Sequence, residues 1–126
     1  MSRSTYEIYG LPVYECSSDG PLLRSDRDAN DLISAAREHQ AGLLIIPLER
    51  LSEDFFQLKA GIAGTIIQKF VTYGVRVAII GDISKQVQSS SSLRDFVYEA
   101  NRGKHAWFVE NRSELEERLR SELRGV

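Results

Sequence analysis

The stretch of residues 51–82 constrains the fold more than any other part of the chain. Residues 52–73 have the pattern of one continuous helix, with Ser52 as its predicted N-cap and Gly74 suited to the left-handed position that follows a helix. The nearly all-apolar run of residues 75–80 comes directly after it. A helix followed at once by a buried strand is typical of a parallel α/β sheet.

The predicted central helix carries more apolar surface than one contact can cover. At about 100° per residue, its two apolar stripes merge into an arc of roughly 220°. We therefore expect the helix to touch the sheet and also a second surface, which is either another helix of this chain or a second subunit. Gly61 and Gly64 would let such a neighbour approach closely. Lys59 projects within the arc, either with its ammonium group in water or held by a carboxylate. The stripes consist of Phe55, Leu58, Ile62, Ile66, Phe70 and Tyr73, and of Phe56, Ala60, Ala63, Ile67 and Val71.

Composition favours one soluble, globular domain that spans residues 1–126. The net charge of −2 gives no electrostatic basis for binding nucleic acid, so we do not expect it. Cys16 is the only cysteine and the two histidines are distant in sequence, which leaves no metal-ligand spacing and no internal disulfide. We see no signal peptide and no membrane span, and we expect a cytoplasmic protein.

Periodicity along the chain predicts the order ββαβαβαβα. The first two strands should form an antiparallel hairpin beside a mostly parallel sheet of about five strands. Residues 86–92 contain four consecutive serines and are expected to be a solvated loop. The right-handed crossover rule leads us to expect helices on both faces of the sheet. The predicted strands are residues 5–9, 13–16, 42–47, 75–80 and 105–109, and the predicted helices are 25–39, 52–73, 93–102 and one that begins near residue 111 or 113.

Four segments carry a family resemblance: SDGPL from Ser18, residues 51–70, VAIIGD from Val77 and LRDFVYEANRG from Leu93. Through them the chain resembles the DUF4180 family of small bacterial proteins, a domain of unknown function, over about residues 6–119. That resemblance implies no activity and no catalytic residue.

The element order also resembles the STAS (anti-sigma-factor antagonist) fold, in which the helix after the central strand is an interaction surface, often switched by phosphorylation of a serine near its start. This chain lacks a DSSG-like motif there and has only Ser52.

Candidate site residues gather where the parallel strands are predicted to end, because ligands tend to bind beyond the carboxyl ends of such strands. They are Glu49, Ser52, Asp54, Asp82, Ser84 and Arg94, with Asp19 if the second strand runs parallel to the third, and Asn101 on the flank of the helix that carries Arg94. No catalytic triad, phosphate loop, metal set or cofactor motif is present in the sequence.

Two functions stay open on this basis. The first is a non-enzymatic regulatory or protein-interaction module, a homodimer or a partner-binding domain, with Phe56, Lys59 and Ile67 of the central helix at the contact. The second is a small-molecule-binding protein or enzyme with its site at the strand ends.

Overall fold

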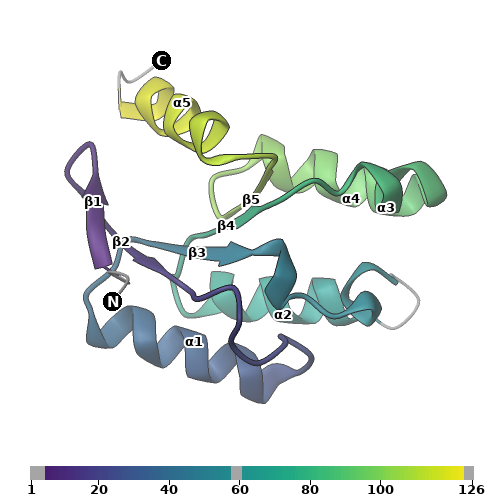
Figure 1. The fold of residues 1–126 in the computed structure, drawn as a ribbon, viewed down its shortest axis with the longest axis horizontal. Helices are drawn as coiled ribbons and strands as arrows, with labels where there is room; N and C mark the ends of the chain where they lie inside the picture. Colours follow the sequence, from purple (N-terminus) through teal and green to yellow (C-terminus); the bar gives the residue numbers. More distant parts are fainter. Residues whose placement is uncertain (1–4, 58–60, 124–126) are drawn as a thin grey trace.

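The computed structural model describes residues 5–57 and 61–123. Its five strands form one sheet in the order β1-β2-β3-β4-β5, and only β1 and β2 are antiparallel (Figure 1). This confirms the predicted α/β class with a mostly parallel sheet and an N-terminal hairpin. The strands are β1 (Thr5–Ile8), β2 (Leu11–Glu15), β3 (Leu43–Pro47), β4 (Val77–Ile80) and β5 (Ala106–Val109).

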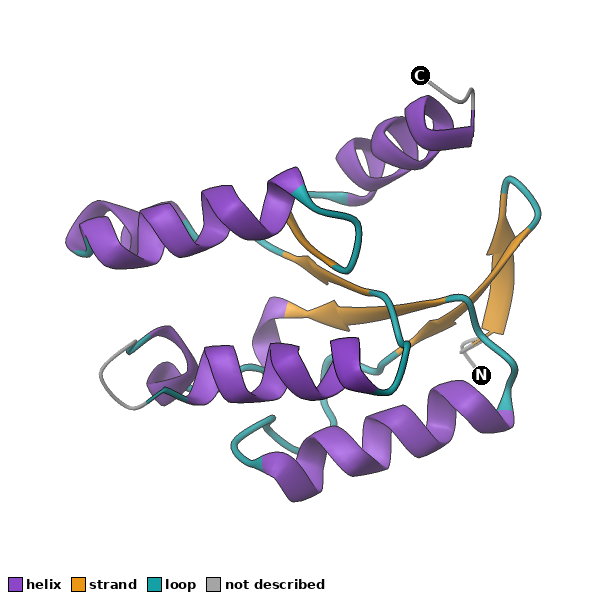
Figure 2. Ribbon diagram, turned by 180° about the vertical axis from the view of Figure 1, so that it is seen from behind, coloured by secondary structure: helices purple, strands orange, loops and turns teal. Residues whose placement is uncertain are grey.

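Among the described residues, four α-helices and two short 3₁₀ turns connect the strands, and a fifth α-helix follows β5; Figure 2 shows them from behind. Each right-handed crossover from β2 to β5 moves one strand further in the same direction, so the connecting helices lie on one face. Only the last helix, α5, lies on the other face. Helices thus lie on both faces of the sheet, as expected, but the crossover helices all share one face. The elements are α1 (Asp26–Glu38), η1 (Leu48–Arg50), η2 (Glu53–Phe56), α2 (Ile62–Thr72), α3 (Ser84–Ser89), α4 (Ser91–Arg102) and α5 (Arg112–Leu123).

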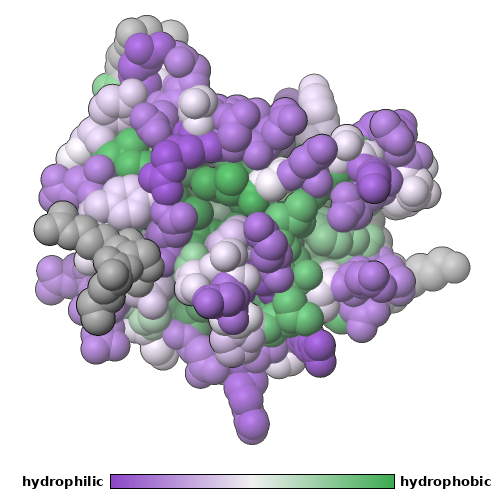
Figure 3. Space-filling view, in the orientation of Figure 1, coloured by the Kyte–Doolittle hydropathy of each residue, from purple (hydrophilic) through white to green (hydrophobic). Residues whose placement is uncertain are grey.

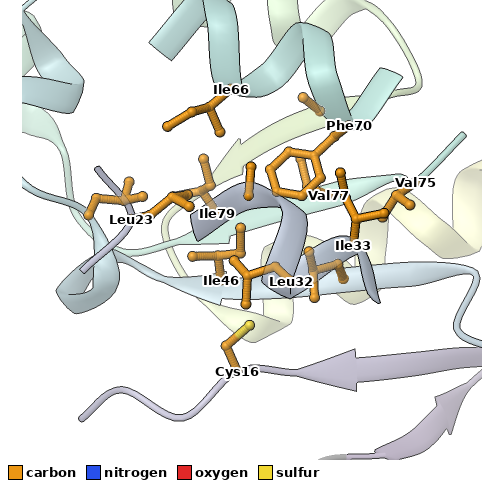
Figure 4. Close-up of a cluster of buried hydrophobic side chains, with 14 of the residues drawn as sticks. Cys16, Leu23, Leu32, Ile33, Ile46, Ile66, Phe70, Val75, Val77 and Ile79 are labelled. Carbon is orange, nitrogen blue, oxygen red and sulfur yellow. The ribbon is translucent and has the colours of Figure 1, made fainter. Parts of the chain in front are cut away.

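Two buried clusters hold these layers together. The larger one packs α1 and α2 on the face of Ile46 and Ile79, and Figure 4 shows Ile66 and Phe70 of α2 directed at that face. The smaller one packs Leu115 and Leu119 of α5 on the opposite face, against residues such as Ala78 and Trp107. Burying each large apolar side chain contributes roughly 1.5–3 kcal/mol, which makes these two clusters the main source of stability.

The prediction of one continuous helix over residues 52–73 is wrong. Residues 53–56 form the 3₁₀ turn η2, Gln57 is extended, and α2 begins only at Ile62. Gly61 has φ +71°, a left-handed conformation that glycine adopts without steric cost and that interrupts a helix. Leu51 is also extended and pairs with Leu23 in an isolated parallel bridge, which keeps the preceding chain out of helical geometry.

Other expectations about this region need correction too. A Cβ atom at Gly64 would meet nothing within 4 Å among the described residues, so no helix of this part of the chain approaches there, and a second subunit stays a prediction. Lys59 lies outside the described residues. Residues 84–89, expected partly as loop, form the short helix α3.

Several local signals were interpreted correctly. The carboxylate of Asp28 accepts a hydrogen bond from the Ser25 backbone N–H at 3.1 Å, which fixes the start of α1. The Asn111 side chain accepts from the Glu114 N–H at 2.9 Å and caps α5. Gly74, with φ +71°, follows the end of α2 as predicted.

Candidate functional site

A crevice of about 500 Å³ lies beyond the carboxyl ends of β4 and β5. It exists because the chain leaves β4 towards α3 and α4 on one face of the sheet, and leaves β5 towards α5 on the other. Adjacent parallel strands whose connections part in this way form the usual ligand-binding crevice of open α/β sheets. We call it the carboxyl-end crevice. Four predicted site residues line it together: Asp82, Ser84, Arg94 and Asn101.

The carboxylates of the crevice also hold the local backbone. Asp82 follows β4, and its Oδ1 accepts a hydrogen bond from the Ser84 N–H at 2.9 Å. That bond and a second one from the Ser84 hydroxyl lower the pKa of Asp82, so its carboxylate is charged over the physiological range. Glu114, in the first turn of α5, accepts from the Glu110 N–H at 3.2 Å.

Asn101 completes the edge of the sheet. Its side-chain Oδ1 accepts from the Phe108 N–H at 2.7 Å, and its Nδ2 donates to the Phe108 carbonyl at 3.2 Å. The amide thus takes the place of a neighbouring strand beside β5, whose backbone groups would otherwise lack partners on that side. Asn101 shapes the wall of the crevice, but both ends of its amide are already engaged.

Of the described residues that line the crevice, Arg94 alone carries a guanidinium group. Its Nη2 donates to the Val87 carbonyl at 3.2 Å, which ties α4 to α3 across the mouth of the crevice. Against it stand three carboxylates, those of Asp82, Glu110 and Glu114. The crevice is therefore acidic in balance.

Apolar side chains line the rest of the crevice, among them Ile83, Val97 and Phe108. Tyr98 lines it as well and is 63% exposed, so its ring is available for contact with a bound molecule. The lining therefore combines polar and apolar side chains in similar measure, so a bound molecule could make both kinds of contact.

The other predicted site residues lie elsewhere. β2 does run parallel to β3, but Asp19 is exposed in the loop after β2 and accepts a hydrogen bond from Ser17. Glu49 and Asp54 are exposed on η1 and η2, and they do not line the carboxyl-end crevice. Ser52 is only 7% exposed, and its hydroxyl has no hydrogen-bond partner among the residues that the structure describes, so its side chain does not cap η2.

Phe56 and Ile67 are half-buried and pack against the larger core cluster. Phe56 also lines a second hollow, of about 760 Å³, between η2 and α3. Ala63, from the same predicted stripe, is fully buried within the chain. The apolar surface that remains for a partner is thus smaller than the sequence suggested.

Sequence reasoning missed the role of Arg50. This side chain is only 9% exposed, and its guanidinium group donates to the carbonyls of Ser17 and Pro21 at 2.8 and 2.5 Å. A Cβ atom at Gly20 would lie 2.6 Å from that group, so the SDGPL loop is fitted around the arginine. Burial raises the pKa of the nearby Cys16 thiol to about 11, although Arg50 acts in the opposite direction. The only signal for this arrangement in the sequence was the family motif itself.

Tyr6, Glu15 and Arg112 form a second unforeseen network, which joins the hairpin to the start of α5. Glu15 accepts hydrogen bonds from the Tyr6 hydroxyl and from the Arg112 guanidinium group, which also lies over the tyrosine ring. Burial and the bond to Glu15 raise the pKa of Tyr6 to about 12. Arg112 is 97 residues from Glu15 along the chain, so no local pattern could predict their contact.

No described group of three or more His, Cys, Asp or Glu side chains could hold a metal ion. Within residues 5–57 and 61–123, no helix combines the length and apolar character needed to cross a bilayer.

Comparison with known proteins gives one match. No curated protein and no solved structure matches the chain. The DUF4180 family model, described as a domain of unknown function, matches residues 9–119, which is most of the chain. The resemblance seen in the SDGPL and NRG segments is thus confirmed, and the chain belongs to the DUF4180 family.

Proposed function

We propose that this domain is a regulatory module that binds a small ligand in the carboxyl-end crevice, and that it is not an enzyme. The observation that supports this is the position of the crevice, where the connections after β4 and β5 part to opposite faces of the sheet. Its volume of about 500 Å³ suits a small metabolite.

The state of the polar groups favours binding over catalysis. A general acid or base must be free to exchange a proton with its substrate. Asp82 and Glu114 instead accept hydrogen bonds from nearby backbone N–H groups, and the Asn101 amide is used at both ends. These groups are held in place, as suits a preformed binding site.

The balance of charge suggests the class of ligand. Three carboxylates face one guanidinium group around an apolar lining. A ligand with a cationic amino group would complement this balance, and an additional carboxylate on it could pair with Arg94. We therefore expect small amines or amino-acid-like zwitterions to bind.

Isothermal titration calorimetry with small amines, amino acids and monocarboxylic acids would test this proposal. We expect an amine or amino acid to bind, and Asp82→Asn to weaken it by about tenfold or more, since a charged hydrogen bond is lost. Asp31→Asn, an exposed change on α1, is the matched control. If no amine or amino acid binds, or if Asp82→Asn and Arg94→Gln both leave binding unchanged, the proposal fails.

A second candidate is a protein-interaction module, either a homodimer or a partner-binding domain. Hydrophobic surface is visible in the middle of Figure 3. Partly buried apolar side chains reach the core from three elements, namely Phe56 of η2, Ile67 of α2 and Phe96 of α4. Light scattering coupled to size-exclusion chromatography would test the homodimer. A dimer that Ile67→Lys converts to a monomer would support it, whereas a monomer at all concentrations would remove it.

A further inference from the structure

A second polar pocket lies at the opposite end of β5 and is not used in the function proposed above. It has a volume of about 460 Å³ and is enclosed by the end of α4, the start of β5 and the last turns of α5. We call it the amino-end pocket. The residues that matter in its lining are Arg102, Gly103, Lys104, Trp107, Arg118 and Glu122.

Trp107 forms a rigid wall of this pocket. The side chain is 4% exposed, and its Nε1–H donates to the Gly103 carbonyl at 2.8 Å. The guanidinium carbons of Arg76 and Arg118 lie over its ring, 4.9 and 4.4 Å from the centroid. Cation–π contact with tryptophan stabilises both arginines, so two positive charges are held close together beside the pocket.

Only part of this positive charge is neutralised. Arg76 forms a two-pronged ion pair with Glu122, with nitrogen–oxygen distances of 2.8 and 3.2 Å. Arg102 has only an exposed contact with Glu99 at 3.4 Å. Neither Lys104 nor Arg118 has a carboxylate within 4.0 Å in the part of the chain that the structure describes.

Helix ends alone do not account for these cations. The carboxyl ends of helices attract positive side chains, and α4 ends beside the pocket. Three carbonyls at that end, those of Asn101, Gly103 and Lys104, already accept side-chain hydrogen bonds. Among the described residues, the Arg118 Nε is in contrast buried without a hydrogen-bond partner, and an unmet buried donor is costly.

We propose that the amino-end pocket binds a small ligand through a phosphate group. A phosphate monoester carries a charge of about −1.5 to −2 at neutral pH, which matches the two cations that lack carboxylate partners. Guanidinium and ammonium groups are the side chains that recognise phosphate oxygens. The volume exceeds that of one phosphate group, so we expect a phosphorylated small molecule to bind more tightly than inorganic phosphate.

Trp107 allows a direct test, because it is the only tryptophan of the chain and lines the pocket. Its fluorescence would be followed while inorganic phosphate, glycerol phosphate or sodium chloride is added at constant ionic strength. We expect a saturable change with both phosphates and none with chloride. Tighter binding of glycerol phosphate would identify a monoester as the ligand class, and equal affinity would identify the phosphate ion alone.

Two variants locate the binding. Lys104→Gln and Arg102→Gln change exposed side chains, so the fold should persist, and each should weaken phosphate binding by about tenfold. Arg120→Gln, which removes an exposed arginine of α5 paired with Glu117, is the matched control and should bind normally. Calorimetry with the same phosphates would measure binding without relying on fluorescence. A response that chloride reproduces, or one that the Lys104→Gln and Arg102→Gln double variant retains, would overturn the proposal.

Discussion

The two ends of β5 carry pockets of similar size and opposite charge. The carboxyl-end crevice presents three carboxylates and one arginine, whereas the amino-end pocket presents three cations and one carboxylate that is already paired. Both are enclosed by the same elements, α4, β5 and α5. Helix dipoles explain the direction of this difference, because α5 begins at the acidic pocket and α4 ends at the basic one.

The pockets differ further in how their polar groups are used. In the carboxyl-end crevice, Asp82, Glu114 and Asn101 are bound to nearby backbone groups. In the amino-end pocket, Lys104 and the Nε of Arg118 have no such partner among the described residues. The carboxyl-end crevice thus presents charged groups that backbone contacts hold in place, whereas the amino-end pocket presents cations with unused hydrogen-bonding capacity.

Gly81→Ala should have the largest effect on the free energy of unfolding, and it should disturb the carboxyl-end crevice directly. Gly81 has φ +156°, and a Cβ atom there would lie 2.3 Å from the Cβ of Leu48. Strain and overpacking together should lower the free energy of unfolding by about 3 kcal/mol or more, measured by urea denaturation. Gly64→Ala, at an open position in α2, should instead raise it by about 0.5–1 kcal/mol. Equal effects from the two changes would contradict the tight packing at Gly81.

Asn101→Ala should affect both pockets. The change removes two hydrogen bonds to the Phe108 backbone at the carboxyl-end crevice. Asn101 also lies in the last turn of α4, which ends beside the amino-end pocket. We expect a loss of about 2 kcal/mol and faster hydrogen exchange of the Phe108 amide. Asn30→Ala, an exposed change on α1, should stay within about 0.5 kcal/mol. Unchanged exchange at Phe108 would mean that the Asn101 amide does not protect β5.

The ion pair of Arg76 and Glu122 should be worth more than a surface pair. Its side chains are 24% and 29% exposed, against 65% and 69% for Arg102 and Glu99. A double-mutant cycle with glutamine replacements should give a coupling of about 1 kcal/mol for the first pair. The second pair should give about 0.3 kcal/mol and should weaken further at high salt. Equal coupling energies would show that partial burial beside the amino-end pocket does not strengthen the ion pair of Arg76 and Glu122.

Much of the fold could be predicted because its signals are local. The capping groups at Ser25 and Asn111 and the apolar strand at residues 43–47 are contained within a few neighbouring residues. The prediction of a continuous helix over residues 52–73 failed, because periodicity does not show whether a glycine such as Gly61 adopts a helical or a left-handed conformation. That choice depends on tertiary contacts, here including the bridge between Leu23 and Leu51.

The contrast between local signals and tertiary contacts also explains which parts of the two pockets could be predicted. Asp82 and Ser84 directly follow a strand, so topology alone places them at the carboxyl-end crevice. The amino-end pocket joins Lys104, Trp107 and Arg118, which come from separate segments and meet only through the docking of α5 on the sheet. No spacing along the sequence marks such a group.

The smallest predicted effect is a difference in how the two pockets respond to acid. Asp82 has a pKa lowered below its ordinary value of 3.8, so its contribution to stability is present above that value and is lost as the pH falls through the folded-state pKa. Asp82→Asn should therefore slightly flatten the acid limb of stability against pH, followed by thermal unfolding, while the control Asp31→Asn should leave it unchanged. Asp82 is exposed, so the effect should be small. The arginines of the amino-end pocket stay charged throughout this range, so the carboxyl-end crevice, with three carboxylates against one, should change its charge balance more. An acid limb that Asp82→Asn leaves unaltered would show that the Ser84 hydrogen bonds do not hold this carboxylate in solution.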